Sequence, residues 1–181
     1  MRQNILFRKS HLFLGLIVLY LFSSCNNPSE ADVNYSFEMY YLSDSNISYS
    51  DAETQPLEKI ELESIPFIAA KDIETYTIIY KVNNPTMSYN ITLKDSVTDG
   101  FADNVRPFVI VVNGNKFALA EYWPSLMSIV PKSIFMYRRL LNEYHLHAGD
   151  DVGNEKMKET IIINTLYNLG IEIIYKEIGG K

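Results

Sequence analysis

Short apolar segments separated by polar stretches make up most of the middle and end of the chain. Several alternate apolar with polar residues or are rich in β-branched and aromatic residues, which is typical of β-strands. The expected strands are 37–42, 57–62, 72–82, 89–93, 108–112, 115–123, 133–137 and 171–175. Segments without a sustained period are 43–56, expected to be a loop, 94–105, a ragged helix or loop, 138–144, a short helix or strand end, and polar 145–153.

The strongest local signal is a β-hairpin centred on Asn113-Gly114. This residue pair suits a type I′ turn, because both central positions of that turn need positive φ. The preceding segment, 108–112, is apolar on both faces, which is typical of strands inside a layered fold. In the return strand, Phe117 and Leu119 are expected on one face and Ala118, Ala120 and Tyr122 on the other.

One helix is expected near the C-terminus. Asn154 offers an N-cap, and Gly170 supplies the left-handed residue that ends helices. Between them runs a wide apolar stripe made of Met157, Ile161, Ile162, Leu166 and Leu169. Strands and helix together predict an α+β fold: a mostly antiparallel sheet with a central hairpin and one C-terminal helix packed on it.

The N-terminus has the pattern of a secretory signal. Three basic residues precede an apolar run at 12–22, which is too short to cross a bilayer as a helix. The run leads into Ser23, Ser24 and Cys25, and this ending resembles the lipobox of bacterial lipoproteins, although Phe22 replaces the usual leucine-like residue. The resemblance implies cleavage before Cys25 and lipidation of that residue, while ordinary cleavage after Ser24 or Cys25 is the alternative.

This resemblance sets the expected organisation and location of the protein. We expect a signal peptide at 1–24, a lipidated cysteine and flexible tether at 25–36, and a single globular domain at 37–181. Lipoproteins of this kind reside in the cell envelope, and Asn26 after the cysteine is compatible with export to the outer membrane. The chain has one cysteine, so no disulfide stabilises the domain.

The charge of the mature chain limits its partners. The formal charge of −6 becomes −9 once the three basic residues of the signal are removed. Nucleic acid is excluded as an expected partner, because binding it needs clustered Lys and Arg. The expected partners are the membrane, through the lipid anchor, and an envelope protein or a glycan. No cofactor is expected.

The central part of the chain, 72–138, contains the segment PFVIVVNGNKFALAEYWPSLMS. It is similar to a group of small, uncharacterised envelope lipoproteins in which an apolar strand ending in Asn-Gly or Asp-Gly precedes a return strand ending in aromatic residues. Ala120 and Glu121 stand where a glycine-containing return strand is usual. The similarity implies a shared fold and no particular activity.

Two groups of residues are candidates for chemistry. His145 and His147 are two apart, so on a strand they would share a face and could bind one metal ion, with Glu143 or Asp150 as a further ligand. Asp95, Asp99 and Asp103 recur at four-residue spacing, so on a helix they would line one face, where paired carboxylates can do acid–base work. The same spacing is also typical of a solvated face. Neither a Gly-x-Ser-x-Gly nucleophile turn nor a glycine-rich phosphate loop occurs.

Tyr122, Trp123 and Met127 form a candidate contact patch at the end of the hairpin. Large aromatic residues often anchor interfaces, but parity with Phe117 and Leu119 also allows Trp123 to close the end of the core. The sequence favours a non-enzymatic, lipid-anchored binding or envelope-assembly protein. The alternatives are a metal-dependent or other hydrolase using the His145–His147 region and a periplasmic inhibitor or immunity-type binder.

Overall fold

The computed structural model divides the chain into two compact units, Met1–Asn34 and Tyr35–Lys181, and the second unit is described here. The described residues are 34–81, 84–97, 101, 104–124, 133–140, 142–147 and 160–178. The expected signal peptide, Cys25 and most of the tether lie outside these residues. So do Met127, Asp99, Asp103, Asp150 and the N-cap expected at Asn154.

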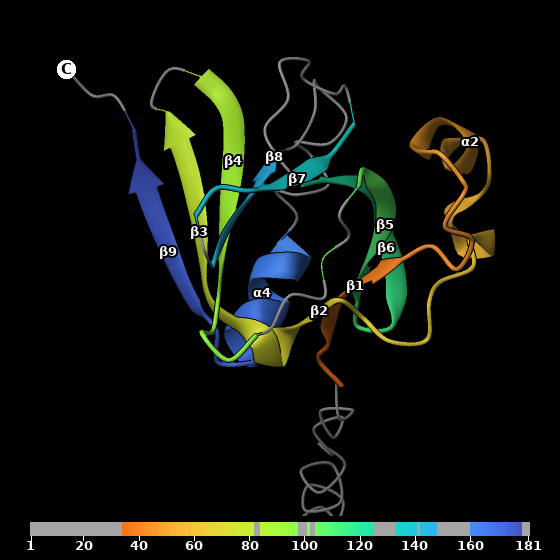
Figure 1. The fold of residues 1–181 in the computed structure, drawn as a ribbon. Coiled ribbons are helices and arrows are strands. Elements are labelled where there is room, and N and C mark those ends of the chain that lie inside the picture. Colours follow the sequence, from red (N-terminus) through yellow and green to blue (C-terminus); the bar gives the residue numbers. More distant parts are fainter. Residues whose placement is uncertain are drawn as a thin grey trace, which may run out of the picture. The chain divides into compact units, whose positions relative to one another are not determined.

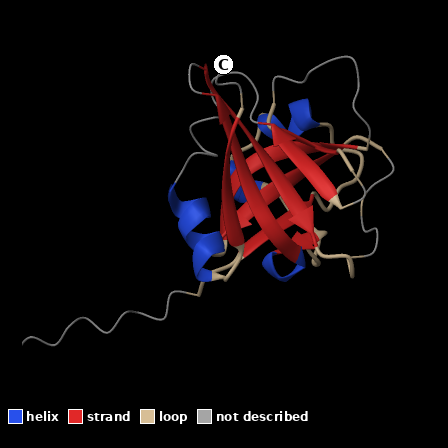
Figure 2. Ribbon diagram, turned by 90° about the vertical axis from the view of Figure 1, so that its left-hand side faces the viewer, coloured by secondary structure: helices blue, strands red, loops and turns tan. Residues whose placement is uncertain are grey.

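Nine strands form one curled sheet, a half-barrel (Figures 1 and 2). The strands are β1 (Phe37–Tyr41), β2 (Ile68–Ala69), β3 (Ile73–Lys81), β4 (Asn84–Leu93), β5 (Arg106–Val112), β6 (Asn115–Trp123), β7 (Phe135–Arg138), β8 (Glu143–His147) and β9 (Glu172–Glu177). Their order is β2-β1-β5-β6-β7-β8-β4-β3-β9. Only β3–β9 and β6–β7 pair in parallel, so the expected mostly antiparallel α+β fold is confirmed.

Helix α4 (Thr160–Asn168) fills the space between the two ends of the sheet. It contacts β9 at one end and β1 and β5 towards the other (Figure 1). Ile162 and Leu166 are fully buried, as expected from the apolar stripe, whereas Ile161 is 42% exposed. Gly170 ends the helix with φ 77°, and the amide of Ile171 donates to the carbonyl of Leu166, which is the pattern of a Schellman motif.

The hairpin between β5 and β6 is confirmed, with φ 51° at Asn113 and 75° at Gly114. Asn113 also joins three parts of the domain. Its Oδ1 accepts the amide of Ser36 at 3.1 Å, and its Nδ2 donates to Oγ1 of Thr165 in α4 at 3.1 Å. The turn therefore holds together the start of β1, the central hairpin and the helix.

A second, smaller apolar cluster forms on the other face of β5. Its buried members are Leu42, Ala52, Ile60, Val109 and Val111. The cover is supplied by α2 (Tyr49–Glu53) and the 3₁₀ helix η1 (Leu57–Lys59). A further 3₁₀ helix, η2 (Ala70–Asp72), follows β2, and its Ala70 packs against the main core. Burial, together with the smaller effects of the charges of Glu53 and Glu121, raises the pKa of Tyr49 to about 12.

Two expectations for this covering segment were wrong. The expected loop 43–56 contains α2, whose N-cap Ser48 accepts the amide of Asp51 at 3.2 Å. The expected strand 57–62 is the helix η1 followed by an isolated bridge between Leu62 and Leu42. Lys116 donates to the carbonyls of Glu58 and Ile60, so a tertiary contact holds this backbone in a conformation that its alternating sequence does not favour.

Residues 143–147 form more regular structure than the sequence indicated. Glu143–His147 forms β8, between β7 and β4, where the sequence left a strand end followed by a polar stretch. Tyr144 and Leu146 are buried in the core, while Glu143, His145 and His147 face the opposite side of the sheet. With two apolar residues in five, this strand is too short for its alternation to stand out.

Candidate functional site

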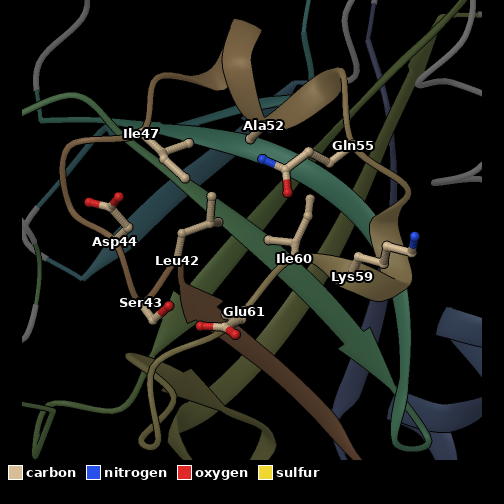
Figure 3. A pocket seen from close by; sticks show the side chains of 9 residues that line it. All are labelled: Leu42, Ser43, Asp44, Ile47, Ala52, Gln55, Lys59, Ile60 and Glu61. Carbon is tan, nitrogen blue, oxygen red and sulfur yellow. The ribbon is translucent and has the colours of Figure 1, made fainter.

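A pocket of about 290 Å³ opens beside the end of β1, under α2 and η1 (Figure 3). Its floor is apolar and consists of Leu42, Ala52, Ile60 and the half-buried Ile47. Its rim is polar and consists of Ser43, Asp44, Gln55, Lys59 and Glu61. An apolar floor with a few polar groups at the rim is the usual composition of a ligand-binding pocket, although this one is at the small end of the range.

Backbone hydrogen bonds hold the two sides of the pocket at a fixed separation. The amide of Ser43 donates to the carbonyl of Glu61 at 3.0 Å, directly after the end of β1. Ser48 caps α2, the helix that contributes Ala52 to the floor. The pocket is therefore built on a strand end and a capped helix and does not depend on side-chain contacts alone.

Arg106 binds the chain at Leu42, directly after the end of β1. Nη2 of Arg106 donates to the carbonyl of Leu42 at 3.0 Å and pairs with Oε1 of Glu63 at 2.5 Å. Its guanidinium also lies 4.5 Å from the centre of the Tyr41 ring, a cation–π distance. These contacts link β5 to both chain segments that lead into the pocket.

The rim of the pocket carries ionisable groups of both signs. Asp44 and Glu61 are carboxylates and Lys59 is an amine, so the formal charge of the rim is one negative charge. One oxygen of Asp44 accepts the amide of Asn46 at 2.9 Å, which orients that carboxylate. A ligand that suits this arrangement has a short aliphatic part for the floor and a cationic group for the carboxylates.

The two histidines proposed as metal ligands do lie together on one face of β8, with ring centres 6.3 Å apart. His145 makes a hydrogen bond between Nδ1 and Oδ1 of Asn90 at 2.7 Å. Burial, together with the smaller effects of the nearby His147 and Arg139, lowers the pKa of His145 to about 4. The ring is therefore neutral at pH 7, so Nδ1 carries the donated proton and Nε2 keeps its lone pair.

The surroundings of these histidines provide hydrogen bonds but no third metal ligand in the described part of the chain. Glu143 accepts a hydrogen bond from the side-chain Nδ2 of Asn90 and pairs with Arg139 at 3.4 Å. No cluster of three His, Cys, Asp or Glu side chains suited to a metal occurs among the described residues. Asp150, the other expected ligand, lies outside them.

The expected contact patch at the end of the hairpin is divided between two faces of the sheet. Tyr122 is only 3% exposed and belongs to the main core, so its assignment to an accessible patch was wrong. The alternation of the strand decides this, because Tyr122 follows Ala118 and Ala120 into the interior. Trp123 is half-buried on the other face and donates from Nε1 to Glu121 at 3.2 Å, while Met127 lies outside the described residues.

The aspartate series does not appear as a paired acid site in the described residues. Asp95 accepts a hydrogen bond from Nδ2 of Asn142 at 2.5 Å, which joins the turn after β4 to the turn before β8. Asp99 and Asp103 lie outside the described residues, as does the lipidation candidate Cys25.

Fold and site together define a β-rich half-barrel domain with a small, mixed-charge pocket on its outer face. The pocket was missed by sequence analysis, because three of its four floor residues come from two segments whose conformations were predicted wrongly. No protein-family model, curated protein or solved structure matches the chain. Within the described residues, helices with the length and hydropathy needed to cross a membrane are absent.

Proposed function

We propose that this protein is a lipid-anchored component of the cell envelope that acts as a non-enzymatic binding module. The location rests on the lipobox-like ending Ser23, Ser24 and Cys25. The binding role rests on one observation above all, the apolar-floored pocket with two carboxylates at its rim. Its occupant is an aliphatic group that ends in a cation, such as a lysine side chain presented by an envelope partner.

Size and charge both support this occupant. A pocket of about 290 Å³ is large enough for one aliphatic side chain and small for an extended ligand. The stem of a lysine covers apolar surface while its ammonium group stays at the solvated rim. The mature chain has a formal charge of −9 after loss of the signal, which favours encounter with a basic partner.

The first experiment uses two small probes that differ in charge. We expect n-butylammonium to shift the amide NMR signals of Ala52 and Ile60 with about millimolar affinity, because few atoms contact the protein. We expect n-butyrate, which has a similar size and the opposite charge, to cause no saturable shift. Equal binding of both probes, or of neither, would contradict the proposal.

A pair of variants tests the role of the rim. Glu61→Gln removes one carboxylate from the pocket and should weaken n-butylammonium binding by up to about fivefold, the range for a solvent-exposed ion pair. Glu58→Gln is the matched control, since this exposed glutamate lies nearby but does not line the pocket. The control should bind as the unmodified protein does.

A second candidate function is a metal-dependent hydrolase at His145 and His147. The hydrogen bond from Nδ1 of His145 to Asn90 favours it, because histidine ligands usually donate their other ring nitrogen to an oxygen acceptor. Titration with Zn²⁺, followed by the ring signals of both histidines, tests this function. The third candidate function, a periplasmic inhibitor or immunity-type binder, would use the same pocket to bind a different partner.

A further inference from the structure

One margin of the half-barrel is an exposed edge strand. β9 pairs with β3 on one side, and no described strand lies on its other side (Figure 1). Five of its six residues are exposed, including the large apolar side chains of Ile174, at 36%, and Tyr175, at 61%. The opposite margin, β2, has only two residues. An exposed edge of this length, with apolar side chains at its centre, is ready to pair with another strand.

We propose that β9 pairs antiparallel with β9 of a second copy of this chain, about a two-fold axis at Ile174. The argument rests on the sequence of the strand, Glu-Ile-Ile-Tyr-Lys-Glu. In this register Glu172 lies opposite Lys176 of the second copy, and the reverse pair forms on the other side of the axis. The two Ile174 side chains meet between these ion pairs on the same face of the joined sheet.

The same register also pairs apolar residues on the face of β9 that packs against the main core. Ile173 lies opposite Tyr175 of the second copy, and Ile173 already packs against the main core. The exposed tyrosine ring would therefore cover the apolar margin of the neighbouring core. This pairing explains why a large aromatic side chain is left 61% exposed at the end of the sheet.

Neighbouring registers lack this match. Because opposed residues must share a face, the two-fold axis can move only by whole residues, to Ile173 or Tyr175. Centring on Tyr175 places Ile174 opposite Lys176, and centring on Ile173 places Glu172 opposite Ile174. Within β9, each alternative sets a charge against an apolar residue and forms no ion pair, so the pairing about Ile174 is favoured by charge and by apolar contact together. A two-fold interface of this kind closes on itself and gives a dimer.

Single cysteines in the full chain test the register directly. Directly opposed residues have Cβ atoms about 4.5–5.5 Å apart, close to the disulfide range. Ile174→Cys should therefore form a disulfide-linked dimer under a mild oxidant. The matched control is Lys176→Cys, whose two copies would be separated by roughly 13 Å along the strands and should not link. The unmodified chain is the control for disulfide-linked dimers formed through Cys25.

A charge exchange tests the ion pairs. In the Ile174→Cys background, Lys176→Glu replaces two attractive pairs with two repulsive ones and should lower the apparent affinity about tenfold. Adding Glu172→Lys restores opposite charges and should restore the cross-linking yield. Circular dichroism shows that each variant is folded. Equal yields from Ile174→Cys and Lys176→Cys, failure of the exchange to restore pairing, or linkage of Ile174→Cys to a different protein would each overturn the proposal.

Discussion

At the scale of single residues, His145 shows how the sheet changes the chemistry of a side chain. The same residue on an exposed loop would titrate near 6.5, whereas burial on β8 lowers its pKa to about 4. Its position between Asn90 and the second histidine gives it a defined tautomer. Spacing in the sequence placed the two histidines on one face but contained no information about this environment.

The shifted pKa of His145 predicts a pH dependence of stability. Between about pH 4 and 6.5 the unfolded chain binds a proton at this residue and the folded protein does not, so stability rises with pH. The stability that the neutral His145 ring contributes is complete above pH 6.5 and is lost as the pH falls towards 4. In urea unfolding, the free energy of unfolding should fall more steeply from pH 6.5 to pH 4 in the unmodified protein than in His145→Gln.

NMR titration provides an independent measurement of the same group. The ring signal of His145 should have a midpoint near 4 in the folded protein. A midpoint near 6.5, or identical pH dependence of stability in the unmodified protein and in His145→Gln, would show that the ring is solvated.

At the scale of secondary-structure elements, helix α4 connects parts of the sheet that are far apart in strand order. It lies against β9 at one margin and against β1 and β5 near the other. Two fully buried side chains, Ile162 and Leu166, supply this contact. The helix therefore stabilises the curl of the sheet as well as its own position.

Replacing Leu166 with alanine should lower the free energy of unfolding by about 2–5 kcal/mol, because the change leaves a cavity in a closely packed core. Ile161→Ala is the matched control on the same helix. Its side chain is 42% exposed, so the expected loss is below about 1 kcal/mol. Chemical denaturation of both variants measures the difference. An unchanged melting temperature for Leu166→Ala would mean that this helix face is not part of the core.

At the scale of the whole molecule, the proposed lipid anchor at Cys25 would determine where the domain acts. The domain begins at Tyr35, and Ser36 is held by the hairpin turn at Asn113. The chain therefore enters the domain beside α4, to which the same asparagine is bonded. A tether of about ten residues would join this point to the lipidated cysteine.

Changing Cys25 to serine should release the mature domain from the membrane fraction. Acyl chains contribute about 0.8 kcal/mol per buried CH₂ group, so several chains hold the protein firmly and a bare tether does not. Fractionation with immunoblotting measures the change, and Ser24→Ala, which keeps a small residue in the lipobox, is the control. A Cys25→Ser chain of processed size that still sediments with membranes would contradict lipid anchoring through this residue.

The sequence by itself was sufficient for the features that depend on local pattern. The hairpin followed from the need for positive φ at Asn113 and Gly114, and the core face of α4 followed from the spacing of Ile162 and Leu166. Most strands were predicted because their residues alternate or are apolar on both faces. These features are decided by interactions within a few residues, so one sequence is enough to find them.

Tertiary structure alone decided how these elements combine. The parallel pairs β6–β7 and β3–β9 and the curl of the sheet join segments distant in the chain. The pocket exists because Lys116 and the outer face of β5 hold 43–62 in a conformation its own pattern does not favour. Tyr122 and Trp123 are adjacent, yet the sheet buries one ring and leaves the other half-buried. Contacts between distant segments set these outcomes, because local preferences are weak beside the burial of apolar surface.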